Sequence, residues 1–349
     1  MARSFLDGVL GAFSQDMAID LGTASTAIHV RRRGVVCREP SVVALYSDHN
    51  GDRRVLAVGQ EARAMLGRTP PDVEVVRPLR DGVIADFEVT EAMLRMFMHQ
   101  CMGPNHVVRP RTVLSIPTST IDVERRAIRE CAEAAGSREV HLVEEPLAAA
   151  LGAGLDVSEA AGNMVIDVGG GTTEIAVISM GRIANHATLK VGGDQMDEAI
   201  VRYLRDARGL LVGPVTAEEL KIHLGAAAPA GRRDGNTAMD VRGRDLVTGY
   251  PRALRVHQDE VREALSGIVQ LIVDCLLATL DKTSPELAAD IVDKGIVMTG
   301  GGAQLRRLDR ALGQATGLPI IVVDDPASAV ARGAGMALDH IEVLGAALA

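Results

Sequence analysis

Short apolar runs alternate with amphipathic stretches along the chain, and this alternation is the pattern of an α/β protein. Runs rich in Val and Ile predict strands at 35–45, 54–59, 112–116, 140–143 and 319–323. Apolar residues at helical spacing predict helices at 60–66, 90–101, 195–208, 216–225, 259–281 and 326–340. The order of these elements favours mixed sheets covered by helices.

The clearest local pattern is a glycine-rich hairpin at residues 165–178. Two short runs of Val and Ile flank a turn that contains Gly169, Gly170 and Gly171. Three glycines in a row leave their backbone N–H groups bare, so a phosphate can approach them closely. Asp167 ends the first strand, where a metal–phosphate group would lie. For this motif alone, a tight hairpin that uses glycine only for its turn stays an alternative.

The same order of strand, acid, glycine turn and strand occurs at residues 17–30. The matching positions are Asp20 with Asp167, Gly22 with Gly169, and Thr26 with Thr173. A third glycine turn stands at 296–302, after another apolar run. An internal duplication predicts two similar halves that face one ligand. We therefore expect each half to offer a hairpin and a carboxylate to a nucleotide between them.

Composition narrows the class of protein. The chain has 349 residues, enough for two domains, and 47% hydrophobic residues but only 2% aromatic ones, which predicts an aliphatic core. The net charge of -9 argues against a nucleic-acid partner, which would require a basic stripe. The four cysteines lie far apart in the sequence, and the nine histidines form no ligand motif. We expect reduced thiols in the cytosol and no metal site made of protein ligands alone.

Two stretches are candidates for contact with a membrane surface. The N-terminal segment 1–15 places five apolar side chains on one face of a predicted helix: Phe5, Leu6, Val9, Leu10 and Phe13. It is either a terminal helix packed on the same molecule or an amphipathic anchor. The loop 102–108 ends in Val107 and Val108, which either touch lipid or start the next strand.

No segment has the pattern of a membrane span or a signal peptide. No apolar run reaches the roughly 20 residues that cross a bilayer. The best candidate, Ile268 to Leu280, is short and carries Asp274. The N-terminus has no small-residue cleavage site after a long apolar stretch.

One carboxylate lies on the apolar stripe of the helix predicted after residues 112–116. We expect Ser119 or Thr120 to cap this helix and Gly136 to end it. Its apolar stripe comprises Ala127, Ile128, Cys131 and Ala135. One turn earlier the stripe continues onto Glu124. A carboxylate there either complements the helix dipole or faces a cleft, and we favour the cleft because an exposed carboxylate need not share the buried face.

Several motifs together resemble the superfamily of actin, Hsp70 and sugar-kinase ATPases. They are the two hairpins, the Glu145-Pro146 helix start and T-G-G-G-A at 299–303. Within that superfamily the chain resembles the MreB/Mbl family of bacterial actins over nearly its whole length. The most specific stretches are R-P-L-R-D-G-V-I-A-D-F-E-V-T-E-A-M-L at 77–94, V-E-R-R-A at 123–127, V-G-G-D-Q-M-D-E-A-I at 191–200, V-R-G-R-D-L-V-T-G at 241–249 and P-E-L-A-A-D-I at 285–291.

The resemblance implies an α/β, actin-like ATPase fold of the ribonuclease-H-like type. Two similar domains would each have a large and a small subdomain, with ATP and Mg²⁺ in the cleft between them. Domain I would cover 1–150, with a small subdomain at about 33–76, and would be completed by the C-terminal helix 325–349. Domain II would cover 151–324, with a small subdomain at about 194–256.

The resemblance also implies roles for the matching residues. Phosphate contacts are expected from Gly22, Thr23, Ala24, Gly169, Gly170, Gly171 and Gly193. The nucleoside is expected at Glu218, Glu219, Leu220, Lys221, Gly301, Gly302, Ala303 and Gln304. Asp20 and Asp167 would orient Mg²⁺ through its waters. Glu124 would orient the water that attacks the γ-phosphate in line. No P-loop motif occurs in the sequence.

The implied function is slow ATP hydrolysis coupled to polymerisation into membrane-associated filaments that direct cell-wall synthesis and rod shape. The implied partners are further copies of the chain, the inner face of the cell membrane and the cell-wall elongation machinery. The apolar N-terminal face and the pair Val107 and Val108 match the family's membrane-contacting positions. The protein would be cytoplasmic and peripheral at that membrane.

Two other functions are compatible with this superfamily. A small-molecule kinase of the sugar-kinase type would need a substrate pocket and an acidic base for a hydroxyl, and it has no use for lipid-facing apolar tips. A chaperone ATPase is disfavoured because no substrate-binding domain follows before the chain ends at Ala349.

Overall fold

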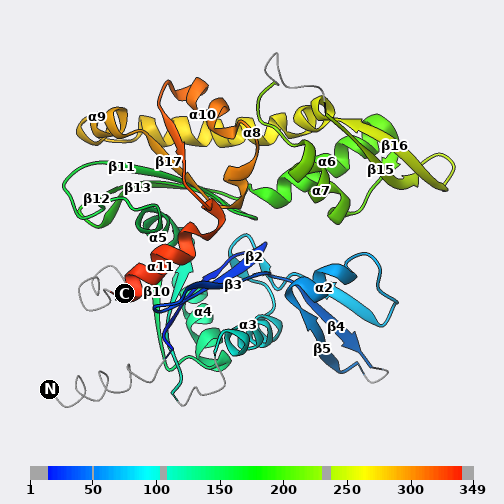
Figure 1. Cartoon of the computed structure of the whole chain (residues 1–349), viewed down its shortest axis with the longest axis horizontal. Coiled ribbons are helices and arrows are strands. Elements are labelled where there is room, and N and C mark those ends of the chain that lie inside the picture. The colour runs from blue at the N-terminus through cyan, green and yellow to red at the C-terminus, as the bar shows by residue number, and fades with distance from the viewer. Residues whose placement is uncertain (1–14, 49–50, 103–107, 230–236, 340–349) are drawn as a thin grey trace.

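Two five-stranded sheets form the centres of two domains, one above the other in Figure 1. The computed structural model describes residues 15–48, 51–102, 108–229 and 237–339. The calls for Phe5, Leu6, Val9, Leu10, Phe13 and Val107 lie outside the described residues.

The first sheet has the strand order β10-β9-β1-β2-β3. Its strands are β1 Met17–Leu21, β2 Ser25–Val30, β3 Gly34–Pro40, β9 Arg111–Ile116 and β10 Glu139–Glu144. The first three strands form an antiparallel meander, and β9 and β10 extend the sheet in parallel from β1. Helices α3 (Phe87–Cys101) and α4 (Asp122–Ala135) contribute to one aliphatic core with this sheet.

The second sheet repeats this arrangement with the order β13-β12-β11-β17-β18. Its strands are β11 Asn163–Val168, β12 Thr173–Ser179, β13 Arg182–Leu189, β17 Ile296–Thr299 and β18 Ile320–Val322. Again a meander is extended by two parallel strands. The hairpin register also repeats, because Leu21 pairs with Thr26 as Val168 pairs with Thr173. The predicted internal duplication is confirmed.

Helices from the second half of the chain cover the second sheet. They are α6 Gly193–Arg208, α8 Gln258–Asp281, α9 Pro285–Lys294 and α10 Leu308–Thr316. Helix α8 has 24 residues and contains the apolar run 268–280. By length and composition alone, it could cross a membrane. Its side chains Leu265, Ile272 and Leu276 are fully buried in the core of this domain. Helix α8 therefore serves as a core helix in this fold.

Two helices lie between the sheets and join the domains (Figure 1). They are α5 (Glu145–Gly152) and α11 (Ala329–Asp339), and one apolar cluster includes side chains of both helices and of both sheets. The helices approach each other unusually closely at two glycines. A Cβ atom on Gly333 would lie 1.7 Å from the carbonyl oxygen of Ala148, and one on Gly152 would lie 1.9 Å from that of Ala329.

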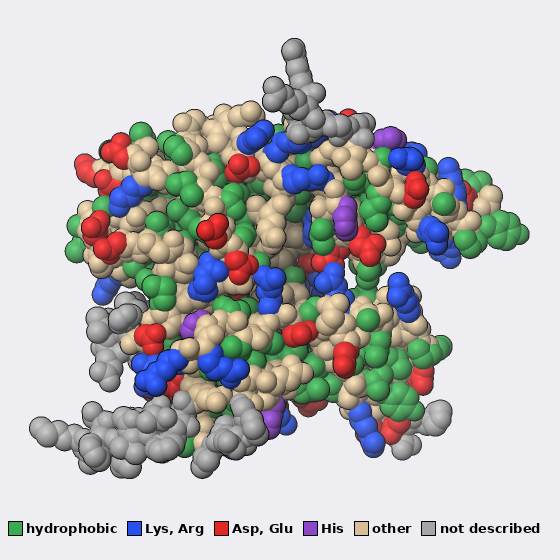
Figure 2. Space-filling view, viewed as in Figure 1, with side chains coloured by type: hydrophobic (Ala, Val, Ile, Leu, Met, Phe, Trp, Pro, Cys, Tyr) green, Lys and Arg blue, Asp and Glu red, His purple; other side chains and the backbone are tan. Residues whose placement is uncertain are grey.

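Each domain also carries a smaller sheet. One consists of β4 Val43–Ser47, β5 Arg53–Val58 and β6 Val73–Val76, with α2 (Gly59–Met65) beside it. The other consists of β14 Leu210–Leu211, β15 Ala238–Asp245 and β16 Pro251–His257, beside α7 (Pro214–Leu224). A short hairpin joins β7 (Leu79–Arg80) to β8 (Val83–Ile84). In the space-filling view of Figure 2 a notch separates the two lobes on the right-hand side.

Two local predictions from the sequence are wrong. The run 35–45 is two strands in different sheets, divided at Ser41, whose N–H donates to the carbonyl oxygen of Ala24. Helix α4 begins at Asp122 and has no side-chain cap from Ser119 or Thr120. The Thr120 hydroxyl donates instead to the carbonyl oxygen of Pro117, at 2.6 Å, and is used within its own turn.

The contact between α5 and α11 predicts a large cost for one methyl group. Gly333→Ala should lower the free energy of unfolding by about 1–3 kcal/mol, because the new Cβ atom would meet backbone that cannot rotate away. Gly267 lies on the exposed face of α8 with open space around it, so Gly267→Ala should stabilise the protein by about 0.5–1 kcal/mol. Urea unfolding measures both, and a Gly333→Ala protein as stable as the control would contradict this packing.

Candidate functional site

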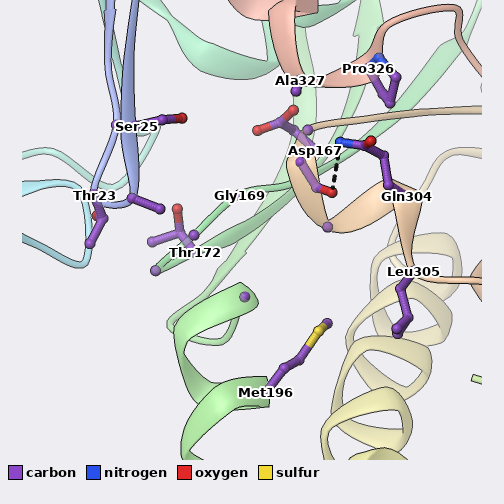
Figure 3. A pocket seen from close by; sticks show the side chains of 18 of the residues that line it. Thr23, Ser25, Asp167, Gly169, Thr172, Met196, Gln304, Leu305, Pro326 and Ala327 are labelled. Carbon is purple, nitrogen blue, oxygen red and sulfur yellow. Dashed lines mark hydrogen bonds between the residues drawn. The ribbon is translucent and has the colours of Figure 1, made fainter. Parts of the chain in front are cut away.

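A cavity of about 460 Å³ lies between the two domains. Its walls come from the β1–β2 turn, the β11–β12 turn, the starts of α6 and α11, one face of α7, and the short 3-10 helix η1 (Gly301–Gln304). Figure 3 shows Thr23 and Ser25 on one side of this space and Gly169 and Thr172 on another. The two predicted hairpins therefore face one shared space.

The turn between β1 and β2 is held by hydroxyl groups. Ser41 donates to the carbonyl oxygen of Gly22 at 2.6 Å, and Thr26 and Ser41 share a hydrogen bond of 2.9 Å. The hydroxyl of Thr23 accepts a hydrogen bond from the N–H of Gly82, at 2.9 Å. These bonds fix the turn before any ligand arrives, as a preorganised phosphate site requires.

The turn between β11 and β12 needs its glycines because other backbone touches it. A Cβ atom on Gly170 would lie 2.4 Å from the Cβ atom of Ala24, in the turn of the other domain. One on Gly171 would lie 3.0 Å from the Thr23 hydroxyl. The start of α6 is bonded to the same turn, because the N–H of Gly193 donates to the carbonyl oxygen of Gly169, at 3.0 Å. The two turns are thus in direct contact across the domain boundary.

Three carboxyl groups line the cavity: Glu145 and Asp167 are buried, and Asp20 is half-buried. Ser115 donates to Asp20 at 2.9 Å, and Thr299 donates to Asp167 at 2.7 Å. Burial raises the pKa of Asp20 to about 6, against the hydrogen bond from Ser115. Burial also raises the pKa of Asp167 to about 7, against the hydrogen bond from Thr299.

Glu145 is the third carboxyl group of the cavity whose pKa is raised. Burial, followed by the charges of Glu174, Asp20 and Asp167, holds the pKa of Glu145 well above its ordinary range. Carboxylates that repel one another in a buried space gain from a cation among them. Hard oxygen donors of this kind fit Mg²⁺. Among the residues that the structure describes, no three acidic, His or Cys side chains form a group that could hold a metal ion.

The far end of the cavity is apolar and narrow. Met196 and Leu305 approach it from α6 and from the segment after η1, as Figure 3 shows, and Ile222 on α7 completes this wall. Gly302 packs on β11, where an added Cβ atom would lie 2.4 Å from Cγ1 of Val168. Such a slot suits a flat ring, and Glu218 and Lys221 line the cavity on the same helix as Ile222.

Most of the expected contact residues line the cavity. They are Asp20, Gly22, Thr23, Ala24, Asp167, Gly169, Gly170, Gly171, Gly193, Glu218, Lys221, Gly301, Gly302 and Gln304. Three expected residues do not line it, since Leu220 and Ala303 are buried in the core and Glu219 is exposed. Only one face of α7 reaches the cavity, so Glu219 and Leu220 turn away from it while Glu218, Lys221 and Ile222 line it.

Glu124 does not line the cavity either. Its carboxylate accepts a hydrogen bond from the N–H of Ile121, at 3.0 Å, and so caps the first turn of α4. For Glu124, the sequence left open a role at the helix end and a role in a cleft, and this hydrogen bond corresponds to the role at the helix end. The carboxylate that the structure adds to the cavity is Glu145. Its signal was the Glu-Pro helix start directly after the β10 strand.

Lys221 is the basic side chain that lines the cavity. Its ammonium group donates to the carbonyl oxygen of Gly193 at 2.8 Å and to Asp197 at 2.9 Å. Burial raises the pKa of Asp197 to about 6, although Lys221 opposes the shift. Lys221 therefore braces the start of α6 beside the glycine turn. Sequence spacing put Lys221 and Glu218 on one face, and each of them pairs with a different partner.

Val108 is the expected membrane residue that the structure describes, and it is half-buried. The strand β9 that follows it begins at Arg111, which pairs with the fully buried Asp16 at 2.7 Å. The ion pair fastens the start of β1 to the start of β9.

Two similar domains that enclose a cavity, with a glycine turn from each, define an actin-like nucleotide-binding fold. A family model described as MreB/Mbl protein matches residues 14–346. The chain belongs to the MreB/Mbl family, whose curated members are cell shape-determining proteins.

Individual relatives agree with this assignment. The chain is 49% identical to the cell shape-determining protein MreB of Escherichia coli (strain K12) over 338 residues, 96% of each chain. It is 47% identical to the cell shape-determining protein Mbl of Bacillus subtilis (strain 168) over 332 residues, which are 95% of this chain and 98% of that one.

Solved structures support the same fold. A crystal structure of MreB 5 of Spiroplasma citri bound to AMPPNP has a TM-score of 0.87 and 33% identity, over 93% of this chain and 96% of that one. A second crystal structure of that protein, bound to ADP, matches equally well. The MamK double helical filament, at 21% identity and a TM-score of 0.75 over 93% of this chain and 99% of that one, shows the fold alone.

The buried acids predict how stability depends on pH. Without metal and nucleotide, the folded state should hold protons that the unfolded state releases, because the pKa of Asp167 is about 7 instead of 3.8. The stabilisation is complete below about pH 4 and is lost as the pH rises through about 7.

Asp167→Asn should flatten this dependence by up to about 4 kcal/mol, measured by urea unfolding in EDTA at a series of pH values. An unchanged slope in the variant would contradict the raised pKa.

Proposed function

We propose that the cavity binds ATP with Mg²⁺ and hydrolyses it. The contact between the two glycine turns at Gly170 and Ala24 carries this proposal, because it brings the backbone of both turns to the edge of one cavity. The AMPPNP and ADP bound by the related Spiroplasma citri protein support a nucleotide here.

The orientation of the nucleotide follows from the two ends of the cavity. The apolar slot between Met196, Ile222 and Leu305 would take the base, and Glu218 on the same wall would accept hydrogen bonds from the ribose. The triphosphate would lie between the turns, where Asp20 and Asp167 would hold Mg²⁺ through its waters. When bound, Mg²⁺ supplies neutralisation of the phosphate charge.

The residue that orients the attacking water is Glu145 in this proposal. Glu145 lines the cavity close enough to Asp20 and Asp167 for their charges to raise its pKa, whereas Glu124 is used as a helix cap. Its place at the first turn of α5 keeps the carboxylate fixed on a rigid element. Glu145 would accept a hydrogen bond from the water and hold it in line with the γ-phosphate.

In the cell, we propose that the chain polymerises into filaments on the inner face of the membrane and directs cell-wall synthesis and rod shape. Membership in a family of cell shape-determining proteins supports this role. The apolar N-terminal face and the pair Val107 and Val108 would supply the lipid contact. The filament, the membrane and the cell-wall elongation machinery would then be its partners.

The assignment of Glu145 predicts a specific loss. Glu145→Gln should slow phosphate release by about 10²–10⁴-fold and leave nucleotide affinity within a few-fold, because it removes the charge without changing the shape. Glu124→Ala is the matched variant and should release phosphate at nearly the wild-type rate. If Glu124→Ala abolishes hydrolysis while Glu145→Gln stays active, the role returns to Glu124.

The membrane role predicts where filaments form. With ATP, electron microscopy should show filaments of the full chain on a lipid monolayer. Deletion of residues 2–14 should remove most binding to liposomes in co-sedimentation, while ATP-dependent pelleting without lipid persists. Unchanged liposome binding would remove the anchor role from this segment. Stimulation of ATP turnover by a sugar, without pelleting, would favour a small-molecule kinase.

A further inference from the structure

Two ion pairs cross from one domain to the other beside the cavity. Arg77 Nη1 lies 2.5 Å from Asp194 Oδ1, and Arg63 Nη2 lies 2.6 Å from Glu218 Oε2. The arginines belong to the first domain, on α2 and after β6, and the acids stand on α6 and α7 of the second. Figure 1 shows these elements facing each other across the open side of the molecule. Because Glu218 also lines the cavity, the pair of Arg77 and Asp194 is the one outside the site already described.

In the second domain, the backbone of Asp194 is hydrogen-bonded directly to the β11–β12 turn. Its N–H donates to the carbonyl oxygen of Gly170 at 2.8 Å, while the neighbouring Gly193 donates to Gly169. Asp194 therefore cannot shift without moving the peptide of Gly170, so a force on its carboxylate is transmitted to that turn.

On the side of the first domain, Arg77 opens the R-P-L-R-D-G segment, 77–82. The next residue, Pro78, accepts hydrogen bonds at its carbonyl oxygen from the N–H groups of Ala85, at 2.9 Å, and Asp86, at 3.2 Å. At the other end of the segment, Gly82 donates to the hydroxyl of Thr23 in the β1–β2 turn. A Cβ atom on Gly82 would lie 2.5 Å from Cγ of Pro117, so the segment is also packed tightly at this end.

One short segment thus contacts both turns that enclose the cavity. Gly82 holds the turn of the first domain through Thr23, and Arg77 holds the turn of the second domain through Asp194. Gly82 also lines the cavity beside the first turn, whereas Arg77 does not line it, so the arginine does not compete with a ligand for space. The stretch that begins with this segment, 77–94, was among the most specific of the family resemblance, and the site as described uses only its Gly82.

We propose that Arg77 is a positioning residue for the nucleotide, and that the segment 77–82 is a strap that keeps the two phosphate-contacting turns closed on each other. The inference rests on the proposed function, because the strap acts through a bound nucleotide. Both side chains of the pair are partly exposed, at 36% for Arg77 and 21% for Asp194, so the pair adds little to folding stability. Its effect falls on the rate at which the turns separate and release their ligand.

The test is a double-mutant cycle on nucleotide dissociation. The full chain is loaded with a fluorescent ATP analogue and Mg²⁺, and release is followed after a chase with unlabelled ATP. Arg77→Ala and Asp194→Asn should each speed release about tenfold, which corresponds to about 1.4 kcal/mol. Because the two residues act as one unit, the double variant should also be about tenfold faster, not about a hundredfold.

A matched control separates the strap from a loss of any surface charge. Arg208 pairs with Glu260 within the second domain, at 32% and 17% side-chain exposure, close to the values of Arg77 and Asp194. Arg208→Ala should release nucleotide within about twofold of the wild-type rate. Without nucleotide, the melting temperature of Arg77→Ala should fall no more than that of this control. A merely structural role for Arg77 would instead lower the melting temperature further.

The outcomes distinguish the two proposals. If the wild-type chain retains nucleotide and Arg77→Ala releases it at the wild-type rate, the strap is refuted and the proposed function stands. Additive effects in the double variant would show that Arg77 does not act through Asp194, and would also overturn the strap. If the wild-type chain retains no Mg²⁺-dependent nucleotide at all, both proposals fail.

Discussion

The structure depends on the close approach of two backbone turns across a domain boundary. The turn at Gly170 lies so near Ala24 that an added Cβ atom would overlap it, and the start of α6 presses on the same turn from behind. Only glycine allows this approach, because a side chain at Gly170 would overlap the other turn. The position of every other group in the site is set relative to this contact. The hydroxyls of Ser41 and Thr23 keep the first turn in shape, and Lys221 supports the second through Gly193.

Closing the two turns on each other also buries negative charge. The contact brings together the carboxyl groups of Asp20, Asp167 and Glu145 at the cavity. Burial raises the pKa of each of them, so their charged forms are unfavourable when no ligand is bound. A cation would neutralise the charge of the carboxylates. The phosphates of a nucleotide would accept hydrogen bonds from N–H groups of the turns. A cavity of this kind would favour a metal–nucleotide pair over either component alone, in agreement with the proposed function.

Two of the connections between the domains differ in physical character. The helices α5 and α11 pack so tightly, at Gly152 and Gly333, that this side of the molecule has no room to open. On the opposite side the connection is made by exposed ion pairs such as Arg77 with Asp194, which break and reform at little cost. A rigid contact on one side and a reversible one on the other is the arrangement from which hinge motion about a ligand arises.

The sequence by itself determined the duplicated fold and the phosphate end of the site, because both rest on local patterns. Strand, acid and glycine turn are contiguous in the chain, and the structure repeats them with the same register at Thr26 and Thr173. Tertiary structure decided which carboxylate enters the cavity. Glu124 and Glu145 both stand in the first turn of a helix, and helical periodicity gives the direction of a side chain only relative to its own helix. Only the packing of α5 between the two sheets turns Glu145 toward Asp20 and Asp167, while the first turn of α4 keeps the carboxylate of Glu124 for its own backbone. The pairing of Arg77 with Asp194 was beyond the sequence for the same reason, since the two residues belong to different domains and no local pattern relates them.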